Sequence, residues 1–369
     1  MTTAKSPVLH PDLTSAQRDC LDALPLMGHH VVNGPPGSGK SLLAAHRAVH
    51  LALTGRPTLL LSRSNLLRRL LGDTLQGITV PGAPVEAATV HSWILRRFGR
   101  DAPRTEDGWF DWAALTHRAA GTFAADASPP HLVIDEGQDL PPGFFRLARL
   151  AAASVTVFAD ECQRLTETNS TLAEITNALG RSTGRVEVVG NHRNSREIAS
   201  LAEHFRTGGP VPEMPAHSGS LPVIRHYAGV KALADDIATM AGAQPRHRVG
   251  VIVNSLRTAA DLMRHLERAG LAHEPQLYRS AAPSGRYRDL DLARPGVVLV
   301  HRASAKGLDF DTVVIADTET DSVTDPTAAS LRMAYYVMIT RARERLVLGW
   351  QGSHLPRQLE GLRGCVTMR

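Results

Sequence analysis

The sequence predicts an α/β protein with two lobes, each built on a parallel β-sheet. Apolar runs of strand length alternate with helical periodicity over almost the whole chain, which is typical of buried strands that are followed by helices. The alternation restarts after a Gly/Pro-rich stretch at residues 207–222, which reads as a linker. A length of 369 residues also suits two domains of ordinary size. We therefore expect a first lobe at 1–206 and a second at 223–369.

The expected strands of the first lobe are HHVVNG, PTLLLSR, HLVIDEG and SVTVFAD, and its helices are SLLAAHRAVHLAL, NLLRRLLGDTL and FFRLARLAAA. Only a very small helical insertion fits near residues 93–130. The expected strands of the second lobe are LPVIRHY, RVGVIVNS, GVVLVHRAS, TVVIADT and RLVLGW, with helices at VKALADDIATMAG and LRTAADLMRHLERAG. Two lobes of this kind would enclose a cleft between them.

Composition indicates a soluble, cytoplasmic protein. Hydrophobic residues make up 43% and charged residues 21% of the chain, and no apolar run is long enough to span a bilayer. The N-terminus lacks the apolar core of a signal peptide. The three cysteines are isolated, which fits neither a disulfide framework nor a metal knuckle. A net charge of +5 permits nucleic acid as a partner without establishing it.

A phosphate-binding loop lies between the first expected strand and its helix. The residues that satisfy the pattern G-x-x-x-x-G-K-S are Gly34, Pro35, Pro36, Gly37, Ser38, Gly39, Lys40 and Ser41. Backbone N–H groups and the helix N-terminus can wrap the phosphates there. Lys40 would neutralise the β/γ oxygens, and Ser41 would ligate Mg²⁺. The alternative, a glycine-rich turn with an incidental lysine, is disfavoured by the strand-loop-helix context.

Two adjacent carboxylates at the end of HLVIDEG supply the acidic partner of such a loop. Asp135 would hold Mg²⁺, and Glu136 would polarise a water for attack on the γ-phosphate. A solvated turn is the alternative reading of the pair. The sequence therefore predicts an NTP hydrolase that uses Mg²⁺.

Eight short strings, in order, make the chain resemble the UvrD/Rep-like branch of superfamily 1 DNA helicases. They are LTSAQRDCL, LSRSN, TVHSW, DEGQD, FADECQRL, GNHRNSREIA, HRASAKGLDFDTVVI and YYVMITRARERL. The resemblance implies two RecA-like lobes with the ATP site in the cleft between them. It also implies catalytic roles for Gln163, for Arg193 at the γ-phosphate and for Arg341 as the arginine finger. Arg343 and Arg345 are expected to be surface charges on the same helix as Arg341.

The resemblance also implies contacts to the nucleotide and to a nucleic-acid strand. Residues implied at the nucleotide, besides the P-loop, are Gln17 as the adenine reader, Leu42, His192, Gly307 and Asp309. Residues implied at single-stranded DNA are Ser62, Arg63, Ser64, Asn65, His91, Ser92 and His301.

The chain departs from the family pattern at both ligands. Leu42 and His192 stand where the family grips adenine, so we expect modest base selectivity carried mostly by Gln17. Asp309 replaces a glutamate that touches the ribose. The run after Gln163 lacks the usual base-stacking aromatic, and the first-lobe aromatics Trp93, Phe98, Trp109 and Trp112 are expected to be packing residues. The full-sized relatives carry helical insertions for which this chain has no room.

Three functions remain open on the sequence. The first is an ATP-dependent single-stranded DNA translocase or helicase, acting in DNA repair or in defence against foreign DNA. The second is a regulatory NTPase subunit that unwinds little by itself and works with a protein partner in a DNA-repair or defence complex. The third is an RNA-directed superfamily 1 motor, which the string GPPGSGKS resembles.

Overall fold

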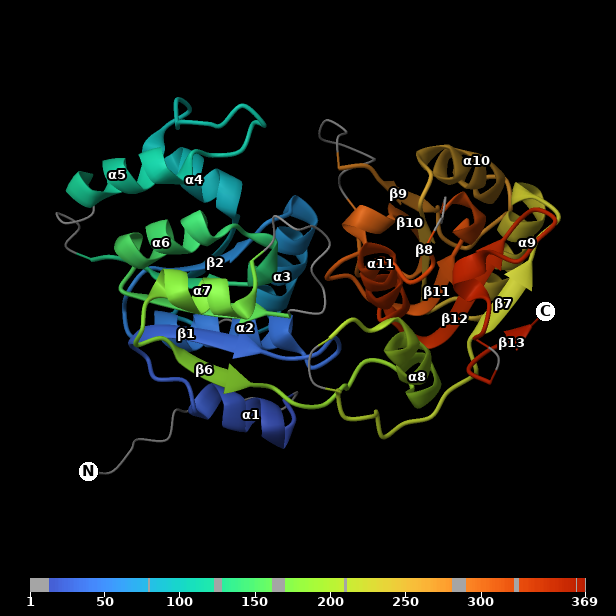
Figure 1. The fold of residues 1–369 in the computed structure, drawn as a ribbon, viewed down its shortest axis with the longest axis horizontal. Helices are drawn as coiled ribbons and strands as arrows, with labels where there is room; N and C mark the ends of the chain where they lie inside the picture. Colours follow the sequence, from blue (N-terminus) through green and yellow to red (C-terminus); the bar gives the residue numbers. More distant parts are fainter. Residues whose placement is uncertain are drawn as a thin grey trace. The chain divides into compact units, whose positions relative to one another are not determined.

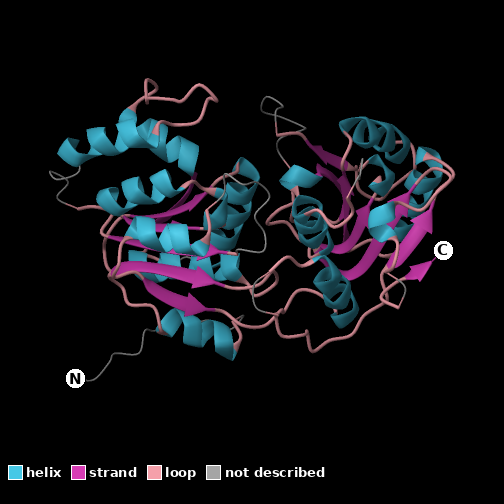
Figure 2. Ribbon diagram, viewed as in Figure 1, coloured by secondary structure: helices cyan, strands magenta, loops and turns pink. Residues whose placement is uncertain are grey.

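The computed structural model describes residues 13–78, 80–122, 128–160, 170–208, 211–280, 290–321, 325–362 and 364–368. These form two compact units, Met1–Val189 and Gly190–Arg369, each of which is an α/β layer structure (Figures 1 and 2). The predicted α/β fold with two parallel sheets is confirmed. Among the described residues, no helix is long and apolar enough to cross a membrane.

The first unit has a parallel sheet in the order β3-β2-β4-β5-β1-β6. Its strands are β1 (Gly28–Asn33), β2 (Thr58–Ser62), β3 (Val85–Thr89), β4 (His131–Ile134), β5 (Ser154–Ala159) and β6 (Gly184–Glu187). Its helices are α1 (Ser15–Asp22), α2 (Lys40–Ala52), α3 (Asn65–Ile78), α4 (Val90–Phe98), α5 (Trp112–Thr122), α6 (Pro142–Ala151) and α7 (Leu172–Leu179), with a 3-10 turn at η2 (Gly137–Asp139).

Both faces of this sheet are covered, which explains why its strands read as continuous apolar runs. Val31 and Leu61 face the layer of α4 to α7, whereas Val32 and Leu60 face the layer of α1 to α3. Successive side chains of a strand point to opposite faces, so each strand serves both cores. The parallel direction places the ends of β1, β4 and β5 at one edge of the sheet, where the predicted catalytic residues follow.

The second unit has a parallel sheet in the order β13-β7-β12-β11-β8-β10-β9. Its strands are β7 (Val223–His226), β8 (Arg248–Val253), β9 (Gln276–Tyr278), β10 (Gly296–His301), β11 (Phe310–Ile315), β12 (Ala342–Trp350) and β13 (Thr367–Met368). Its helices are α8 (Arg196–Phe205), α9 (Val230–Ala243), α10 (Leu256–Leu266) and α11 (Ala329–Ile339), with 3-10 turns at η4 (Arg302–Ser304), η5 (Thr318–Thr320) and η6 (Arg357–Leu359).

Two boundaries differ from the sequence-based expectation. Helix α8 packs against α11 and β12, so it belongs to the second unit, although its residues fall in the expected first lobe 1–206. The expected helix containing Arg341, Arg343 and Arg345 is wrong, because α11 ends at Ile339 and β12 begins at Ala342. The strand extends to this point because Phe310 of β11 pairs with Ala342 before the register shifts.

Candidate functional site

The P-loop joins β1 to α2, as the sequence predicts. Gly39, with φ of 85°, is the N-cap of α2, and Gly37 also has a positive φ of 80°. Gly34 is needed for close approach, since a Cβ there would lie 2.8 Å from the Ser38 Oγ and 2.9 Å from the Val188 carbonyl oxygen. Between them, Pro35 and Pro36 carry the turn, and the Ser38 hydroxyl donates to the Pro35 carbonyl at 2.9 Å. The loop therefore has a fixed, glycine-dependent shape.

The Lys40 ammonium is held inside this loop. Its Nζ donates to the carbonyl oxygens of Gly34 at 2.6 Å and Pro35 at 2.8 Å, and lies 3.3 Å from the Asp160 Oδ2. Lys40 is only 8% exposed, and Asp160 is buried beside it. The loop thus holds the Lys40 ammonium where a bound phosphate would need a cation. A phosphate that binds there would compete with Asp160 for the ammonium.

Asp135 leaves the end of β4 and lies next to the loop. Burial, and then the neighbouring charge of Glu136, raise the pKa of Asp135 to about 7, although a hydrogen bond from Ser41 opposes the shift. Its Oδ2 is buried and has no hydrogen-bond partner among the described residues. A buried carboxylate with a free oxygen beside a serine hydroxyl fits a divalent cation, so Ser41 and Asp135 would hold Mg²⁺. That ion would supply charge neutralisation at the phosphates.

Glu136 has an unusual backbone and a fixed side chain. It is the one non-glycine residue with a positive φ, 54°, in the part of the chain that the structure describes. The buried Gln138 donates its Nε2 to the Glu136 Oε2 at 2.5 Å and accepts the Asp160 N–H at 3.0 Å through its Oε1. Gln138 thus ties the carboxylate to the end of β5. Sequence reasoning assigned no role to Gln138 or Asp160, although both stand in the quoted strings DEGQD and FADECQRL.

Gln17 contacts the P-loop itself. Its Nε2 donates to the Ser38 carbonyl at 2.8 Å, and its Oε1 accepts the Thr14 N–H at 3.0 Å, completing a capping box at the start of α1. The side chain is 4% exposed and lies so close to Gly39 that a Cβ there would be 2.3 Å from the Gln17 Nε2. These contacts give Gln17 a part in holding the loop, besides the implied contact to adenine. Leu42, one turn into α2, packs at the edge of the core.

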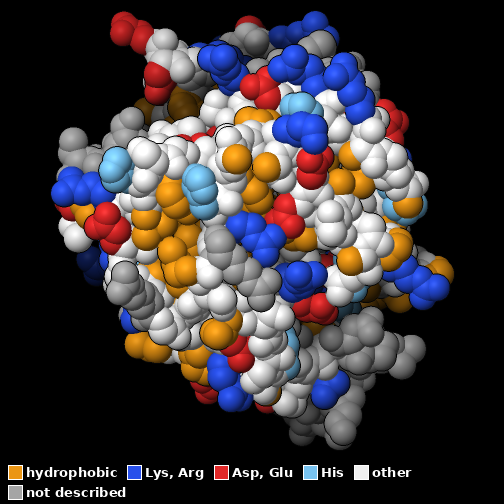
Figure 3. All heavy atoms as spheres, turned by 90° about the vertical axis from the view of Figure 1, so that its right-hand side faces the viewer, with side chains coloured by type: hydrophobic (Ala, Val, Ile, Leu, Met, Phe, Trp, Pro, Cys, Tyr) orange, Lys and Arg blue, Asp and Glu red, His pale blue; other side chains and the backbone are white. Residues whose placement is uncertain are grey.

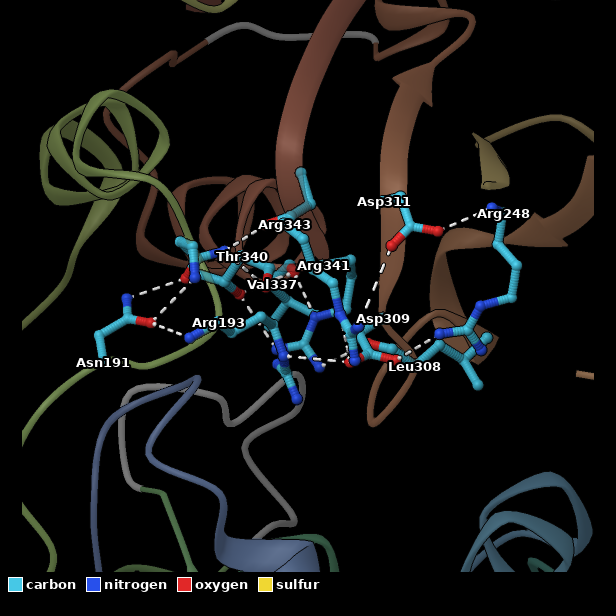
Figure 4. Close-up of polar contacts among 12 residues, drawn as sticks. Asn191, Arg193, Arg248, Leu308, Asp309, Asp311, Val337, Thr340, Arg341 and Arg343 are labelled. Atoms are coloured by element: carbon cyan, nitrogen blue, oxygen red, sulfur yellow. Dashed lines mark hydrogen bonds and ion pairs between the residues drawn. The ribbon is translucent and has the colours of Figure 1, made fainter. Parts of the chain in front are cut away.

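In the second unit, Asp309 lies among three arginines (Figure 4). Its Oδ2 accepts from the Arg343 Nε at 3.0 Å and lies 3.8 Å from the Arg193 Nε, while its Oδ1 accepts from Arg248 at 3.4 Å. Burial opposes the charge on Asp309, but Arg193, Arg343 and Arg248 outweigh it and hold its pKa below the ordinary value. Asp309 therefore fixes the Arg193 side chain, a role that its expected place near a ribose did not suggest.

Arg341 is built into the second unit. The side chain is 1% exposed, and its guanidinium donates to the Val337 carbonyl at 2.9 Å, the Leu308 carbonyl at 3.3 Å and the Thr340 hydroxyl at 3.0 Å (Figure 4). Arg341 thus joins the end of α11 to the turn before β11. Gly307, with φ of 76°, forms that turn.

His192 is exposed and its ring folds back towards Gly190. Gln163 lies outside the described residues. The implied catalytic and nucleotide residues are therefore divided between the units, with Gln17, the P-loop, Leu42, Asp135 and Glu136 in the first and His192, Arg193, Gly307, Asp309 and Arg341 in the second.

Several implied nucleic-acid residues have local structural roles. The Ser62 hydroxyl donates to the Ser64 carbonyl, the Ser64 hydroxyl accepts the Leu67 N–H, and Ser92 completes the capping box of α4. The two ring nitrogens of His301 contact Asn254 O and Ala303 N. Asn65 begins α3.

Arg63 and His91 belong to a cluster with aromatic residues. The Arg63 guanidinium lies 5.3 Å from the centre of the Trp109 ring, and the His91 ring lies 5.2 Å from that of Phe110. On the face drawn in Figure 3, Lys and Arg side chains are interspersed with Asp, Glu and a patch of hydrophobic side chains.

Fold and site together define a P-loop NTPase with two α/β units, each built on a parallel sheet. Residues 89–348 match the profile of the viral superfamily 1 RNA helicase core domain, and the chain belongs to this family of NTP-hydrolysing helicases. This match establishes a superfamily 1 helicase core and does not distinguish the UvrD/Rep-like branch within that superfamily. A search of the curated proteins finds no significant similarity.

Among solved structures, the C-terminal domain of a possible DNA helicase from Lactobacillus plantarum WCFS1 is 22% identical, covering 48% of this chain and 97% of that one with a TM-score of 0.35. Arterivirus nonstructural protein 10, a helicase, is 16% identical, covering 95% of this chain and 63% of that one with a TM-score of 0.43. The Escherichia coli DEAH/RHA helicase HrpB is 13% identical, covering 96% and 44% with a TM-score of 0.46. The chain thus spans less than two thirds of the latter two, and none of the three is similar enough to transfer residue roles.

Proposed function

We propose that this protein is a Mg²⁺-dependent ATPase that moves along single-stranded DNA, as a translocase or helicase of the UvrD/Rep-like type. The observation that carries the proposal is the P-loop site, in which Lys40, Asp135 and Glu136 are buried, and Asp160 and Gln138 connect Lys40 to Glu136. The strings NHRNS, AKGLDF and YYVMITRA favour the UvrD/Rep-like branch and DNA.

In the proposed reaction, Lys40 binds the β- and γ-phosphates and Glu136 accepts a proton from the attacking water. Gln138 keeps the Glu136 carboxylate at the end of β4 in the orientation that this step needs. Arg193 and Arg341 would offset charge that develops on the γ-phosphate. Mg²⁺, held by Ser41 and Asp135, would neutralise the phosphate oxygens.

An RNA-directed motor is the second candidate, because the matching family is one of viral RNA helicases. A regulatory NTPase subunit, active only with a protein partner in a repair or defence complex, is the third. The three differ in what stimulates hydrolysis.

Steady-state ATPase activity, measured with single-stranded DNA, single-stranded RNA and duplex DNA at two salt concentrations, separates them. We expect strong stimulation by single-stranded DNA that weakens with salt, because phosphate contacts release counterions. Stimulation by RNA alone would support the second candidate. Activity that ignores every nucleic acid would contradict the motor and support a partner-dependent subunit.

Replacing Gln17 tests whether it reads the base or holds the loop. Because both polar ends of its amide contact the protein, we expect Gln17→Ala to lower kcat/KM for ATP and GTP by the same factor, about three- to tenfold, as for the lost hydrogen bond to the Ser38 carbonyl of the P-loop. In the wild type, ATP should be preferred over GTP by less than about tenfold. A loss confined to ATP would assign Gln17 to base recognition alone. Inorganic tripolyphosphate, which has no base, serves as the control ligand in a binding assay.

A further inference from the structure

Trp109 differs from Trp93, Phe98 and Trp112, although all four were expected to be packing residues. Trp93 is buried in the core, and Phe98 and Trp112 pack against it. Trp109 is 37% exposed and lies outside that cluster, with its ring centre 6.3 Å from that of Trp112. The Trp109 indole is therefore accessible to a ligand, although it adjoins a buried aromatic core.

The loop that carries Trp109 is tightly braced. Arg104 and Phe110 form an antiparallel bridge, and the Thr105 N–H donates to the Trp109 carbonyl at 2.8 Å. The Arg104 guanidinium lies 4.5 Å from the centre of the Phe110 ring and donates to the Gly108 carbonyl at 2.9 Å. The Asp107 carboxylate accepts the Trp109 N–H at 3.3 Å. A ring held in this way loses little conformational freedom when a ligand stacks on it.

One cationic group, the Arg63 guanidinium, lies over the Trp109 ring, and a second, that of Arg104, lies over the neighbouring Phe110 ring. Besides Arg63 over Trp109, the Arg104 Nη2 lies 3.1 Å from the His91 Nε2. Burial, and then Arg104, lower the pKa of His91, so the imidazole is neutral at pH 7 and can act as a stacking or hydrogen-bonding surface. Glu106 and Asp107 stand in the same loop, so the local charge is mixed. Stacking, rather than long-range attraction, is therefore the interaction this surface is built to make.

Arg63 also connects this surface to the ATP site. Its Nη1 donates to the Asp139 carbonyl at 3.4 Å, at the end of the turn η2 that holds Gln138. Gln138 in turn holds Glu136. A ligand that displaces Arg63 from the Trp109 ring would also change the contact of Arg63 with Asp139, the residue next to Gln138, which orients the Glu136 carboxylate.

We propose that Trp109, together with Arg63 and Arg104, is a stacking site for a base of single-stranded nucleic acid. Every base has a π-face, so such a platform binds without sequence preference, and an arginine beside the ring can contact the backbone or stack in its turn. The inference rests on the proposed function and supplies a stacking aromatic for a chain whose expected position after Gln163 has none.

The test compares binding of a fluorescently labelled oligothymidylate with that of the same backbone without bases. Wild-type protein should prefer the oligothymidylate. Trp109→Ala should lower its affinity for the oligothymidylate by about five- to hundredfold, as for one lost base stack, and remove the preference over the abasic strand. Trp109→Phe should restore most of both. Leu150→Ala, which removes a 48% exposed apolar side chain from α6, is the matched control and should bind as wild type does.

Three outcomes would overturn the assignment. Trp109→Ala could bind as the wild type does, or could lose affinity for both strands equally, which would show a structural effect. If the alanine variant unfolds, Trp109→Leu, which keeps apolar volume without a ring, repeats the comparison. A preference for the oligothymidylate that is retained in Trp109→Leu would also contradict stacking. If wild-type protein binds neither strand, the proposed function fails as well, so the two failures are distinguishable.

Discussion

Lys40→Ala should abolish ATP hydrolysis, with kcat falling by at least about 10²–10³-fold, the effect of removing one preorganised charge-stabilising donor. The physical reason is that Lys40 is the cation the loop holds for the phosphates, through the Gly34 and Pro35 carbonyls. The measurement is steady-state phosphate release. Glu136→Gln should also stop turnover while still binding nucleotide, since it keeps the loop and its lysine.

Lys40→Ala should also destabilise the first unit. Lys40 pairs with the buried Asp160, and removing one partner of a buried pair costs up to about 3–5 kcal/mol. The double variant Lys40→Ala/Asp160→Asn should regain most of the lost unfolding temperature without regaining turnover. Full activity in Lys40→Ala, or equal stability of the single and double variants, would contradict these two roles respectively.

Arg341→Ala should lose both activity and stability. Since Arg341 is the proposed arginine finger, its removal is expected to lower kcat by about 10³-fold or more. Loss of its buried guanidinium, which donates to the Val337 and Leu308 carbonyls, should also lower the unfolding temperature by roughly 6–24 °C, because charged hydrogen bonds each contribute about 1.5–3 kcal/mol.

The two effects are separated by measuring kcat at a temperature well below the unfolding midpoint of the variant. Wild-type kcat in folded Arg341→Ala would refute the finger and leave only a structural arginine. Arg264→Ala is a matched control, because Arg264 is an exposed residue of α10 paired with Asp261 and should change neither quantity.

The sequence predicted the framework well because it depends on burial. Strands such as β1 and β4 are covered on both faces, so they leave a continuous apolar signature, and the P-loop needs glycines at fixed places. The start of β12 was missed, since pairing of Phe310 with Ala342 extends the strand into a segment with helical character.

Side-chain contacts could not be predicted from spacing. The string T-S-A-Q at the start of α1 carries a capping-box signature that would have indicated one role of Gln17, yet the contact of Gln17 with Ser38 depends on how α1 packs against α2. The exposure of Trp109 depends on how residues 99–111 fold back over α4, for which the sequence has no periodic signal. Gln138 could have been found from the motif string, but its bond to the Asp160 N–H joins residues that follow two different strands, β4 and β5.

The left-handed backbone conformation of Glu136 lowers the stability of the fold at a position where the proposed hydrolysis needs a carboxylate. A residue with a Cβ in this conformation costs about 1–2 kcal/mol, which glycine avoids and asparagine reduces. The remainder of the fold must supply that free energy for the carboxylate to stay where it is. A search for thermally stable variants that ignores hydrolysis would therefore favour replacing the residue on which hydrolysis depends, and a heat-resistant but inactive protein is the natural product of such a search.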